Sequence, residues 1–579
     1  MTKEKWIDDL LGKMTLEQKV GQMMVFGFAG PIITPDIIDM IKKYHVGGFR
    51  ICLKFRTQTL LHDIKPGTEP DENILRSLVF PHGNHIDYAD PSRCTFCTPK
   101  EYAEVLNRLR DYALDRELGI PIHFTIDQEG NGSDDLINGQ RLFPSPMGIT
   151  ATCDPEMAFK VAKSIGMQAR ALGSNMIHSP VVDVNTNPKN PEIGPRAYSD
   201  HTDDVIKYAV SAAKGFAEVG MIATAKHFPG RGESESDAHW GLPKVSLDKE
   251  TLFNVHIAPY RAMIEAGIPA IMSAHSLYPA LGITDKPSST SKEILEELLR
   301  QELGFKGVIT TDNMMMGGML QRFEIREAVV QAIIGGNDLV LYRDESAQRP
   351  RIIEAVVNAV KENRISEKRI DESVQRILPM RWDMGLMENG GKVDAEKASE
   401  PINDPYVVNT AIEAAEKSVL KLRDEANILP LSPDKRILLI EQIFPTQQMA
   451  NNMSCHPGML WEELCNYSEN VGQVEIPIIP SEADWQRVMR RVDEAEVIVT
   501  TNYYYHKVAS SINDRVRELY KTGKPVVAIS NNPYEFASPK DFPTVINLFA
   551  PAGKENQNVV AKLIFGKIET TAKVPVKLG

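Results

Sequence analysis

The sequence lacks the features that mark membrane, secreted and nucleic-acid-binding proteins. It contains no run of about 18 apolar residues, so no membrane span is expected. Its first residues lack the uninterrupted apolar core of a secretory signal peptide. Acidic residues outnumber basic ones, 78 to 65, and the formal net charge of −13 argues against nucleic acid or an anionic membrane as the main partner. The six cysteines are scattered over 579 residues without forming a disulfide framework, so we expect a cytoplasmic location.

Short apolar runs alternate with helical patterns through the first part of the chain. Capping boxes at Thr15 and Thr98 mark the starts of two helices. Strands alternating with helices in this number predict a (β/α)8 TIM-like barrel, although a doubly wound open sheet would show the same alternation. The predicted strands cover residues 24–27, 47–53, 122–126, 176–184, 221–225, 270–274, 308–311 and 338–341.

The chain is too long for a single hydrophobic core, so at least two domains are expected. We assign residues 1–386 to the barrel, 387–404 to a polar linker and 405–579 to a smaller α/β sandwich domain. In the last of these, apolar runs at 436–441, 497–501, 525–530 and 545–548 predict a mainly parallel sheet. This second domain has no Gly-x-Gly-x-x-Gly motif, no P-loop and no clustered titratable groups, so no chemistry is assigned to it.

An insertion at about 54–93 is rich in Pro, Gly, His and Asp, and we expect it on the catalytic face of the barrel. Two histidines and two cysteines in and just after it have a spacing that could bind zinc: His82, His85, Cys94 and Cys97. Their order is inverted relative to common zinc fingers, so we predict loop residues and free thiols, with no metal.

Polar side chains stand where several predicted strands end. In a barrel the carboxyl ends of all strands meet at one rim, where such proteins place their sites. Any one of these residues could be a turn former, a helix cap or a satisfied core residue, but their convergence predicts an active site. They are Asp127 and Glu129 after the third strand, Asp183 after the fourth, Lys226 and His227 after the fifth, His275 after the sixth and Asp312 after the seventh.

The loop after the fifth strand carries a second set of reactive groups. Pro229, Gly230 and Gly232 interrupt the strand and predict a mobile loop. Asp237 and His239 follow two residues apart, a spacing at which a carboxylate can orient and stabilise an imidazole. Glu233 and Glu235 of the same loop are rival general acids or, alternatively, solvated charges.

These residues carry a family resemblance. Residues 226–230 (Lys-His-Phe-Pro-Gly) followed by Asp-x-His at 237–239 resemble the signature of the β-N-acetylglucosaminidase branch of glycoside hydrolase family 3. Residues 126–130, 180–185 and 307–312 resemble the same branch, and the tail resembles the end of the family's second domain. Two positions depart from the pattern. The arginine expected shortly after residue 130 is absent, with Arg141 a candidate substitute, and Arg231 stands where the branch often has histidine.

The resemblance implies a retaining glycosidase without a cofactor or metal. Asp312 would be the nucleophile that forms a glycosyl-enzyme ester, and His239 the acid/base whose tautomer Asp237 fixes. The substrate-binding residues that it implies are Asp127, Arg196, Lys226 and His227. A further candidate is His275, which lies at a strand end and could equally be a core residue.

The leading functional prediction is hydrolysis of terminal β-linked N-acetylglucosamine from a small molecule or oligosaccharide. A phosphorylase, in which phosphate replaces water beside a neutral imidazole, and a β-glucosidase of the same family are alternatives. A lyase that uses Lys226 as a Schiff base is a more remote one. A non-catalytic carbohydrate-binding protein would need neither Asp312 nor the Asp237 and His239 pair. The sequence does not predict an oligomeric state.

Overall fold

A computed structural model describes residues 2–29, 32–52, 98–130, 133–137, 139–443, 455–504 and 512–579. The predicted insertion at 54–93, and with it His82, His85, Cys94 and Cys97, lies outside these described residues. Among the described helices, none is both long and apolar enough to cross a membrane.

The first sheet is a closed barrel of eight parallel strands, which confirms the predicted (β/α)8 fold and excludes the open-sheet alternative. The strands follow one another in the order β7-β6-β5-β4-β3-β2-β1-β8. A parallel bridge between Thr310 and Leu339 joins β7 to β8 and closes the ring. The strands are β1 (Met24–Ala29), β2 (Gly48–Cys52), β3 (His123–Ile126), β4 (Met176–Ile177), β5 (Ile222–Phe228), β6 (Ala270–Ser273), β7 (Val308–Thr311) and β8 (Val340–Tyr342).

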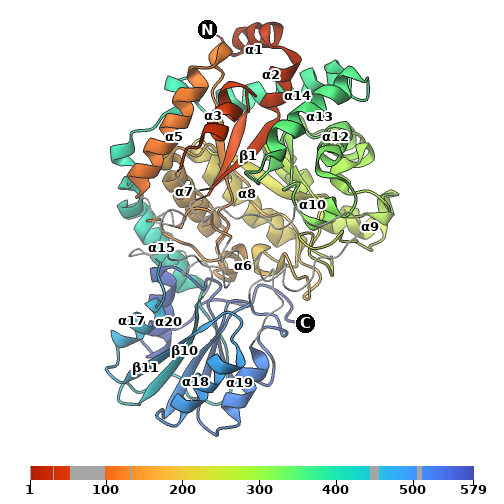
Figure 1. The fold of residues 1–579 in the computed structure, drawn as a ribbon. Coiled ribbons are helices and arrows are strands. Elements are labelled where there is room, and N and C mark those ends of the chain that lie inside the picture. Colours follow the sequence, from red (N-terminus) through yellow and green to blue (C-terminus); the bar gives the residue numbers. More distant parts are fainter. Residues whose placement is uncertain are drawn as a thin grey trace.

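Helices surround this barrel, as Figure 1 shows. The two predicted capping boxes are present, because Thr15 and Thr98 each accept a backbone N–H at 3.2 Å and each receives the reciprocal side-chain bond. The longer helical elements around the barrel are α1 (Lys3–Lys13), α2 (Leu16–Gln22), α3 (Pro35–Lys42), α5 (Pro99–Leu114), α7 (Pro155–Leu172), α8 (Thr202–Glu218), α10 (Ala258–Glu265), the π-helix η7 (Glu293–Glu302), α12 (Ile325–Gly335), α13 (Gln348–Lys361) and α14 (Glu367–Asp383).

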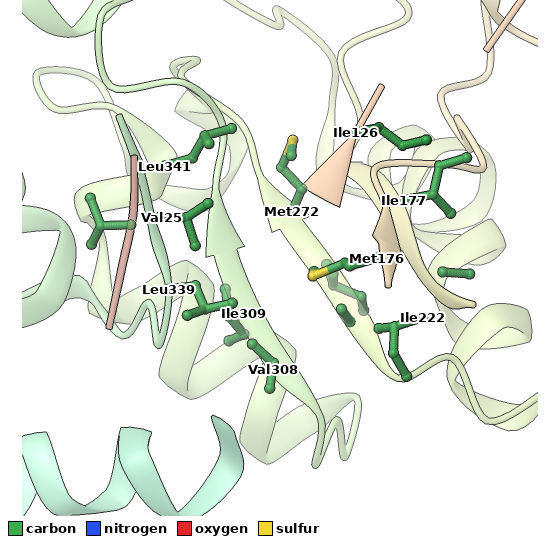
Figure 2. Packing of buried hydrophobic residues seen from close by; sticks show 14 of the residues in the cluster. Val25, Ile126, Met176, Ile177, Ile222, Met272, Val308, Ile309, Leu339 and Leu341 are labelled. Atoms are coloured by element: carbon green, nitrogen blue, oxygen red, sulfur yellow. The ribbon is translucent and has the colours of Figure 1, made fainter. Parts of the chain in front are cut away.

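The barrel interior changes from apolar to polar along the strands. Side chains alternate between the two faces of a strand, so residues two apart share a face. On β5, Ile222 is followed on its face by Thr224 and then by Lys226; on β7, Val308 is followed by Thr310 and then by Asp312. Figure 2 shows the apolar layer, where Ile222 and Val308 lie among other buried strand residues. Burial of each large apolar side chain stabilises the fold by about 1.5–3 kcal/mol, and the polar layer above this base forms the barrel mouth.

The second sheet has the strand order β11-β10-β12-β13-β14-β9, with only β9 antiparallel to its neighbour. Its strands are β9 (Leu420–Asp424), β10 (Ile437–Ile443), β11 (Val471–Pro477), β12 (Val497–Asn502), β13 (Val526–Ser530) and β14 (Thr544–Asn547). Four of them match predicted runs. The two edge strands β9 and β11 were not predicted, because both are partly exposed and their polar residues interrupt the apolar pattern on which the prediction relied.

The second sheet and its helices lie below the barrel in Figure 1. These helices are α17 (Met459–Cys465), α18 (Glu482–Val492), α19 (Asn513–Tyr520) and α20 (Lys554–Ile564). Helix α15 (Pro405–Ser418) packs against both parts, because Val407, Ala411 and Ala414 belong to the barrel core while Ala415 belongs to the core of the second sheet. The predicted linker, 387–404, contains three short 3-10 turns. The exact domain limits stay a prediction.

Candidate active site

The carboxyl ends of β3, β5 and β7 bring Asp127, Lys226 and Asp312 to the same mouth of the barrel. The strand pairing fixes this arrangement, since Lys226 pairs with Met272 of β6 and Met272 pairs with Thr310 of β7. Residues paired in neighbouring strands point to the same face, so Lys226 and Asp312 both point inward. The convergence predicted from the strand ends is therefore present in the fold.

The carboxylate of Asp312 accepts one hydrogen bond from a backbone N–H and one from an arginine side chain. Its Oδ1 accepts the backbone N–H of Asn313 at 2.7 Å, and its Oδ2 accepts a hydrogen bond from Arg231 Nη2 at 3.2 Å. Burial alone would raise the pKa of this carboxyl, but the positive charge of Arg231, with His275 and His239, lowers it to about 2. The side chain keeps 14% of its surface exposed. Asp312 is thus an ionised carboxylate that a ligand can reach.

Arg231, the residue of this loop that departs from the family pattern, lies against Asp312 and is fully buried. Its Nη2 also lies 2.7 Å from Glu192 Oε1, so a single guanidinium nitrogen is shared by two carboxylates. Burial alone would lower the pKa of Arg231, but the charges of Glu192 and Asp312 raise it. In this chain the cation beside Asp312 is therefore permanently charged, whereas a histidine at this position would titrate near neutrality.

His239 and Asp237 form the dyad that their spacing predicts. His239 Nδ1 lies 2.7 Å from Asp237 Oδ1, and the same oxygen accepts the backbone N–H of His239 at 2.8 Å. Asp237 is buried, whereas the His239 side chain is 23% exposed. The loop is held close to Asp312, because Gly317 donates its backbone N–H to the carbonyl of His239 at 2.9 Å. A Cβ at Gly317 would lie 2.6 Å from that carbonyl oxygen, so this close approach requires glycine.

Glu192 was not predicted and links the two sets of groups. In addition to its contact with Arg231, its Oε2 accepts the backbone N–H of Ala238 at 3.1 Å, inside the dyad loop. Its Oε1 lies 3.5 Å from Nδ1 of His239. Glu192 lies in the long loop after β4, away from a strand end, so a search of strand ends does not find it. Its position four residues before Arg196 is the only sequence signal that could have found it.

A balanced cluster of charges occupies the opposite side of the mouth. Lys226 Nζ lies 2.5 Å from Glu129 Oε1 and 3.2 Å from Asp127 Oδ1. Arg196 makes a two-pronged contact with Glu129, at 2.8 and 3.0 Å. Burial alone would raise the pKa of Asp127, but Lys226 and, still more, Arg50 hold it well below its usual value. The predicted residues Asp127, Lys226 and Arg196 therefore lie together, and Asp127 is the member with an exposed edge, at 25%.

Arg50 of β2 was not predicted and contacts Asp127 at the barrel mouth. Its Nη2 donates to Asp127 Oδ2 at 2.6 Å and to Asp135 Oδ2 at 2.7 Å. Arg141, the candidate substitute, lies elsewhere: it pairs with Glu555 and donates to the carbonyl of Ile402 at 2.6 Å. Arg50 lies within a predicted apolar strand. A single charged residue in an apolar run was the sequence feature that could have marked it as a site residue.

His227 and His275 are both buried but differ in what their ring nitrogens can do. His227 Nδ1 lies 2.7 Å from Asp183, and Nε2 lies 3.9 Å from Asp312. Burial, with Arg231 nearby, holds the pKa of His227 well below its usual value, so the ring is neutral. With Nδ1–H donating to Asp183, Nε2 is left as an acceptor near Asp312.

His275 uses both nitrogens within the protein, on Ser289 Oγ at 2.7 Å and on the carbonyl of Asn313 at 3.2 Å. Burial lowers its pKa to about 4. Because its nitrogens are occupied, the geometry favours support of the Asp312 strand end over contact with a substrate. The predicted substrate contact of His275 stays untested.

The rival acids of the loop, Glu233 and Glu235, make no contact with Asp312 or with the dyad within the described residues. Glu235 is exposed, and Glu233 accepts a hydrogen bond from the hydroxyl of Thr186. Glu192, Asp237 and His239 offer ligand atoms within 4.8 Å of one another, the one such group among the described residues. The donors of this group already serve Arg231 and the dyad, and the expectation of a site without metal stays a prediction.

The second domain contacts a loop at the barrel mouth. Asn185, in the loop after β4, donates to Tyr534 Oη at 2.7 Å. Burial raises the pKa of Tyr504, to which the nearby negative charge of Asp237 adds, so the loop after β12 lies close to the dyad. Neither contact could be predicted from a local sequence pattern.

Comparison with known proteins agrees with this geometry. Residues 15–380 match the family model described as "Glycosyl hydrolase family 3 N terminal domain". The chain belongs to glycoside hydrolase family 3.

The chain is 30% identical over 368 residues to "Beta-hexosaminidase A" of Pseudoalteromonas piscicida, covering 59% of this chain and 61% of that protein. It is 29% identical over 333 residues to "Beta-N-acetylglucosaminidase/beta-glucosidase" of Cellulomonas fimi, covering 56% and 58%. It thus spans about three fifths of these relatives. A solved family 3 β-N-acetylglucosaminidase from Paenibacillus sp. str. FPU-7 superposes with a TM-score of 0.80 at 27% identity, covering 98% of this chain and 99% of the other.

Proposed function

We propose that this protein is a retaining glycosidase that hydrolyses terminal β-linked N-acetylglucosamine. The observation that carries the proposal is the pairing at one barrel mouth of an ionised, partly exposed Asp312 with the His239–Asp237 dyad. Retention needs a nucleophile on one face of the sugar and an acid/base on the other. The names of the Cellulomonas fimi relative and of the solved Paenibacillus structure, both of which include β-N-acetylglucosaminidase, support N-acetylglucosamine as the sugar.

In the proposed first step, Asp312 attacks the anomeric carbon and the glycosidic C–O bond breaks. His239 donates its proton to the leaving oxygen, so an alcohol departs and a glycosyl ester remains on Asp312. Since Nδ1 is bonded to Asp237, Nε2 is the nitrogen that exchanges this proton. In the second step His239 removes a proton from water, the hydroxide attacks the anomeric carbon, and Asp312 leaves as a carboxylate.

Arg231 supports the first step by keeping Asp312 ionised. The same contact also opposes the reaction, because a positive charge held close to the carboxylate lowers the free energy of the resting nucleophile. The group of Asp127, Lys226, Arg196 and His227 is proposed to hold the sugar hydroxyls and the acetamido group. Lys226 is engaged by two carboxylates, which disfavours a Schiff-base lyase.

A panel of aryl β-glycosides tests the proposal: the N-acetylglucosaminide, glucoside, xyloside and N-acetylgalactosaminide, each in phosphate-containing and phosphate-free buffer. We expect the N-acetylglucosaminide to have the highest kcat/KM and free sugar to be the product in both buffers. A preference for the glucoside would indicate glucose in place of N-acetylglucosamine as the sugar. Formation of a sugar 1-phosphate would indicate that phosphate, and not water, is the acceptor. Sugar binding without turnover would refute an enzymatic function.

We further propose a cytoplasmic location. The four cysteines within the described residues, Cys52, Cys153, Cys455 and Cys465, are all free thiols, as a reducing compartment favours.

A further inference from the structure

Three side chains of the barrel mouth that can each bind a metal ion lie close together. They are Glu192, Asp237 and His239, whose ligand atoms all lie within 4.8 Å of one another. Carboxylate oxygen and imidazole nitrogen are both zinc ligands in proteins. Because this group contains the proposed acid/base, a metal ion bound to it would act directly on the reaction.

The distances within the group fit a tetrahedral ion. Glu192 Oε1 lies 3.5 Å from His239 Nδ1. Bonds of about 2.0–2.2 Å to zinc at a tetrahedral angle place two ligand atoms about 3.4 Å apart. Asp237 Oδ1 lies 2.7 Å from the same nitrogen, which is the length of a hydrogen bond. An ion between Glu192 and His239 would therefore take the place of the proton on Nδ1, and Asp237 would become its third ligand.

The ion pairs of the mouth form one network whose net charge is negative. Its cations are Arg50, Lys226, Arg196 and Arg231, and its carboxylates are Asp127, Glu129, Asp135, Asp183, Glu192, Asp237 and Asp312. Burial lowers the pKa of His178 and of His227, which also belong to the network, so these rings add no positive charge at pH 7. Burial raises the pKa of Asp183 only to about 6, so this carboxyl is ionised at pH 7. The carboxylates outnumber the cations even when Arg343, which lies near Arg50, is counted with them. A divalent cation would therefore reduce an excess of negative charge.

Two arginines limit how tightly such an ion can bind. Arg231 and Arg196 lie 2.7 and 3.9 Å from Glu192 Oε1 and repel a further cation there. Each is shared with another carboxylate, Asp312 or Glu129, so neither neutralises Glu192 alone. The His239 side chain is partly exposed, which gives an ion a route from solvent. These features suit reversible binding better than a permanent structural site.

An ion on Nδ1 would stop His239 from acting as an acid. In the proposed reaction Nε2 gives a proton to the leaving oxygen while the Nδ1–H remains bonded to Asp237. With the ion on Nδ1, the single proton of the neutral ring lies on Nε2, and its loss would leave an imidazolate. The leaving oxygen would then receive no proton, although the ion lies on the side of the ring away from Nε2.

We infer that Glu192, Asp237 and His239 form an inhibitory site for a divalent cation of the zinc class, which binds reversibly and removes the acid/base. The site is not a cofactor site, so the proposed hydrolysis proceeds without a metal. The effect on activity rests on the proposed function, whereas the binding does not. Magnesium serves as the control ion, because it prefers six oxygen ligands in an octahedron.

The activity test uses Zn²⁺ alone as the probe. The parent protein is the full chain with Cys94→Ser and Cys97→Ser, which removes the other possible zinc ligands noted in the sequence. Zinc should lower kcat/KM for an alkyl N-acetylglucosaminide by about tenfold or more, and much less for the p-nitrophenyl glycoside, whose leaving group needs little protonation. EDTA should restore the activity, and Mg²⁺ at the same concentration should not lower it.

The binding test measures the affinity for Zn²⁺ by calorimetry, without any glycoside. Glu192→Gln and His239→Ala each remove one ligand and should weaken zinc binding by a factor of about ten or more. Glu233→Gln alters a carboxyl of the same loop outside the group and should leave the affinity unchanged. If one of the two ligand variants fails to fold, the other decides.

Three results would overturn the inference: equal inhibition of the two glycosides, no loss of activity with zinc, or an unchanged zinc affinity in Glu192→Gln and His239→Ala. If the protein cleaves neither glycoside in the absence of zinc, the proposed function fails, and calorimetry decides the site by itself. Weaker binding in both ligand variants but not in Glu233→Gln would then support the site, and equal binding in all of them would refute it.

Discussion

The two sheets of this protein are both mainly parallel, yet the carboxyl ends of their strands carry opposite kinds of side chain. In the barrel these ends carry ionised groups such as Asp127, Lys226 and Asp312. In the second sheet they carry neutral amides and phenols. The residues concerned are Gln442 near the end of β10, Asn502, Tyr503 and Tyr504 at β12, Asn531, Asn532 and Tyr534 after β13, and Asn547 at β14.

The difference follows from what a buried polar group needs. Amides satisfy one another and the backbone without a counter-charge, as when Asn502 donates to the carbonyl of Ala537 at 2.7 Å and Asn531 accepts the N–H of Tyr504 at 2.8 Å. Buried charges require opposite charges and remain available to a ligand only where one is left partly exposed. We propose that the second sheet positions the mouth, through contacts such as that of Tyr534 with Asn185, while the barrel carries the chemistry.

The largest effect that this contrast predicts is at the barrel end. Asp312→Asn should lower kcat/KM on the preferred aryl glycoside by a factor on the order of 10⁴ or more, since removing a nucleophile abolishes the covalent route. As the control from the second sheet, Asn502→Ala should cost less than about tenfold, with its effect mainly on stability. Comparable losses in the two variants would remove the distinction between the sheets.

The next effect concerns the dyad. His239→Ala should lower kcat/KM by about 10²–10⁴ for an alkyl glycoside, whose leaving group needs a proton, and by much less for a p-nitrophenyl glycoside. Glu233→Gln, which alters a carboxyl of the same loop, should show no such dependence on the leaving group. If Glu233→Gln and not His239→Ala showed this dependence, the acid would have to be reassigned.

A third prediction concerns the pH dependence that Arg231 imposes. Arg231 holds the pKa of Asp312 at about 2, and kcat/KM requires the ionised carboxylate. In Arg231→Met this pKa should rise, because burial is then opposed by less positive charge, so the acidic limb of the kcat/KM profile should move to higher pH. Activity would fall more at pH 4 to 5 than at pH 7. Arg231→His should shift the limb less than Arg231→Met, and an unmoved limb in both would refute this role of Arg231.

The smallest effect is a change in stability within the second sheet. Glu441 of β10 is buried, its Oε2 accepts from Gln473 at 2.7 Å, and burial raises its pKa to about 7. The unfolded chain loses this proton near its ordinary pKa of about 4.5, while the folded chain keeps it to about 7. Between about pH 4.5 and pH 7 the folded state therefore binds more protons than the unfolded state, so the free energy of unfolding falls as the pH rises through this range.

Glu441→Gln should remove that loss and stabilise the protein at pH 8 by at most about 3 kcal/mol, with little change at pH 5 and none in kcat/KM. Thermal unfolding at the two pH values measures it. A Tm gain of equal size at both would point to packing as the cause.

Sequence reasoning located the strands of the barrel and the side chains at their ends, because apolar runs followed by Asp127, Lys226 and Asp312 are local patterns. It did not find Arg50, whose significance depends on a neighbouring strand: its guanidinium pairs with Asp127, which follows β3. Glu192 belongs to a loop, and its partners, Arg231 and Ala238, are about forty residues away. The edge strands β9 and β11 escaped because half-exposed strands need no continuous apolar run.

The most direct test of the account is to trap the proposed ester. A 5-fluoro glycosyl fluoride of N-acetylglucosamine forms the intermediate quickly and releases it slowly, so intact-mass measurement followed by peptide mapping identifies the residue that carries the sugar. The account predicts one added glycosyl group per chain, on Asp312, and none in Asp312→Asn. A sugar found on another residue, or turnover of the reagent without any covalent adduct, would contradict it.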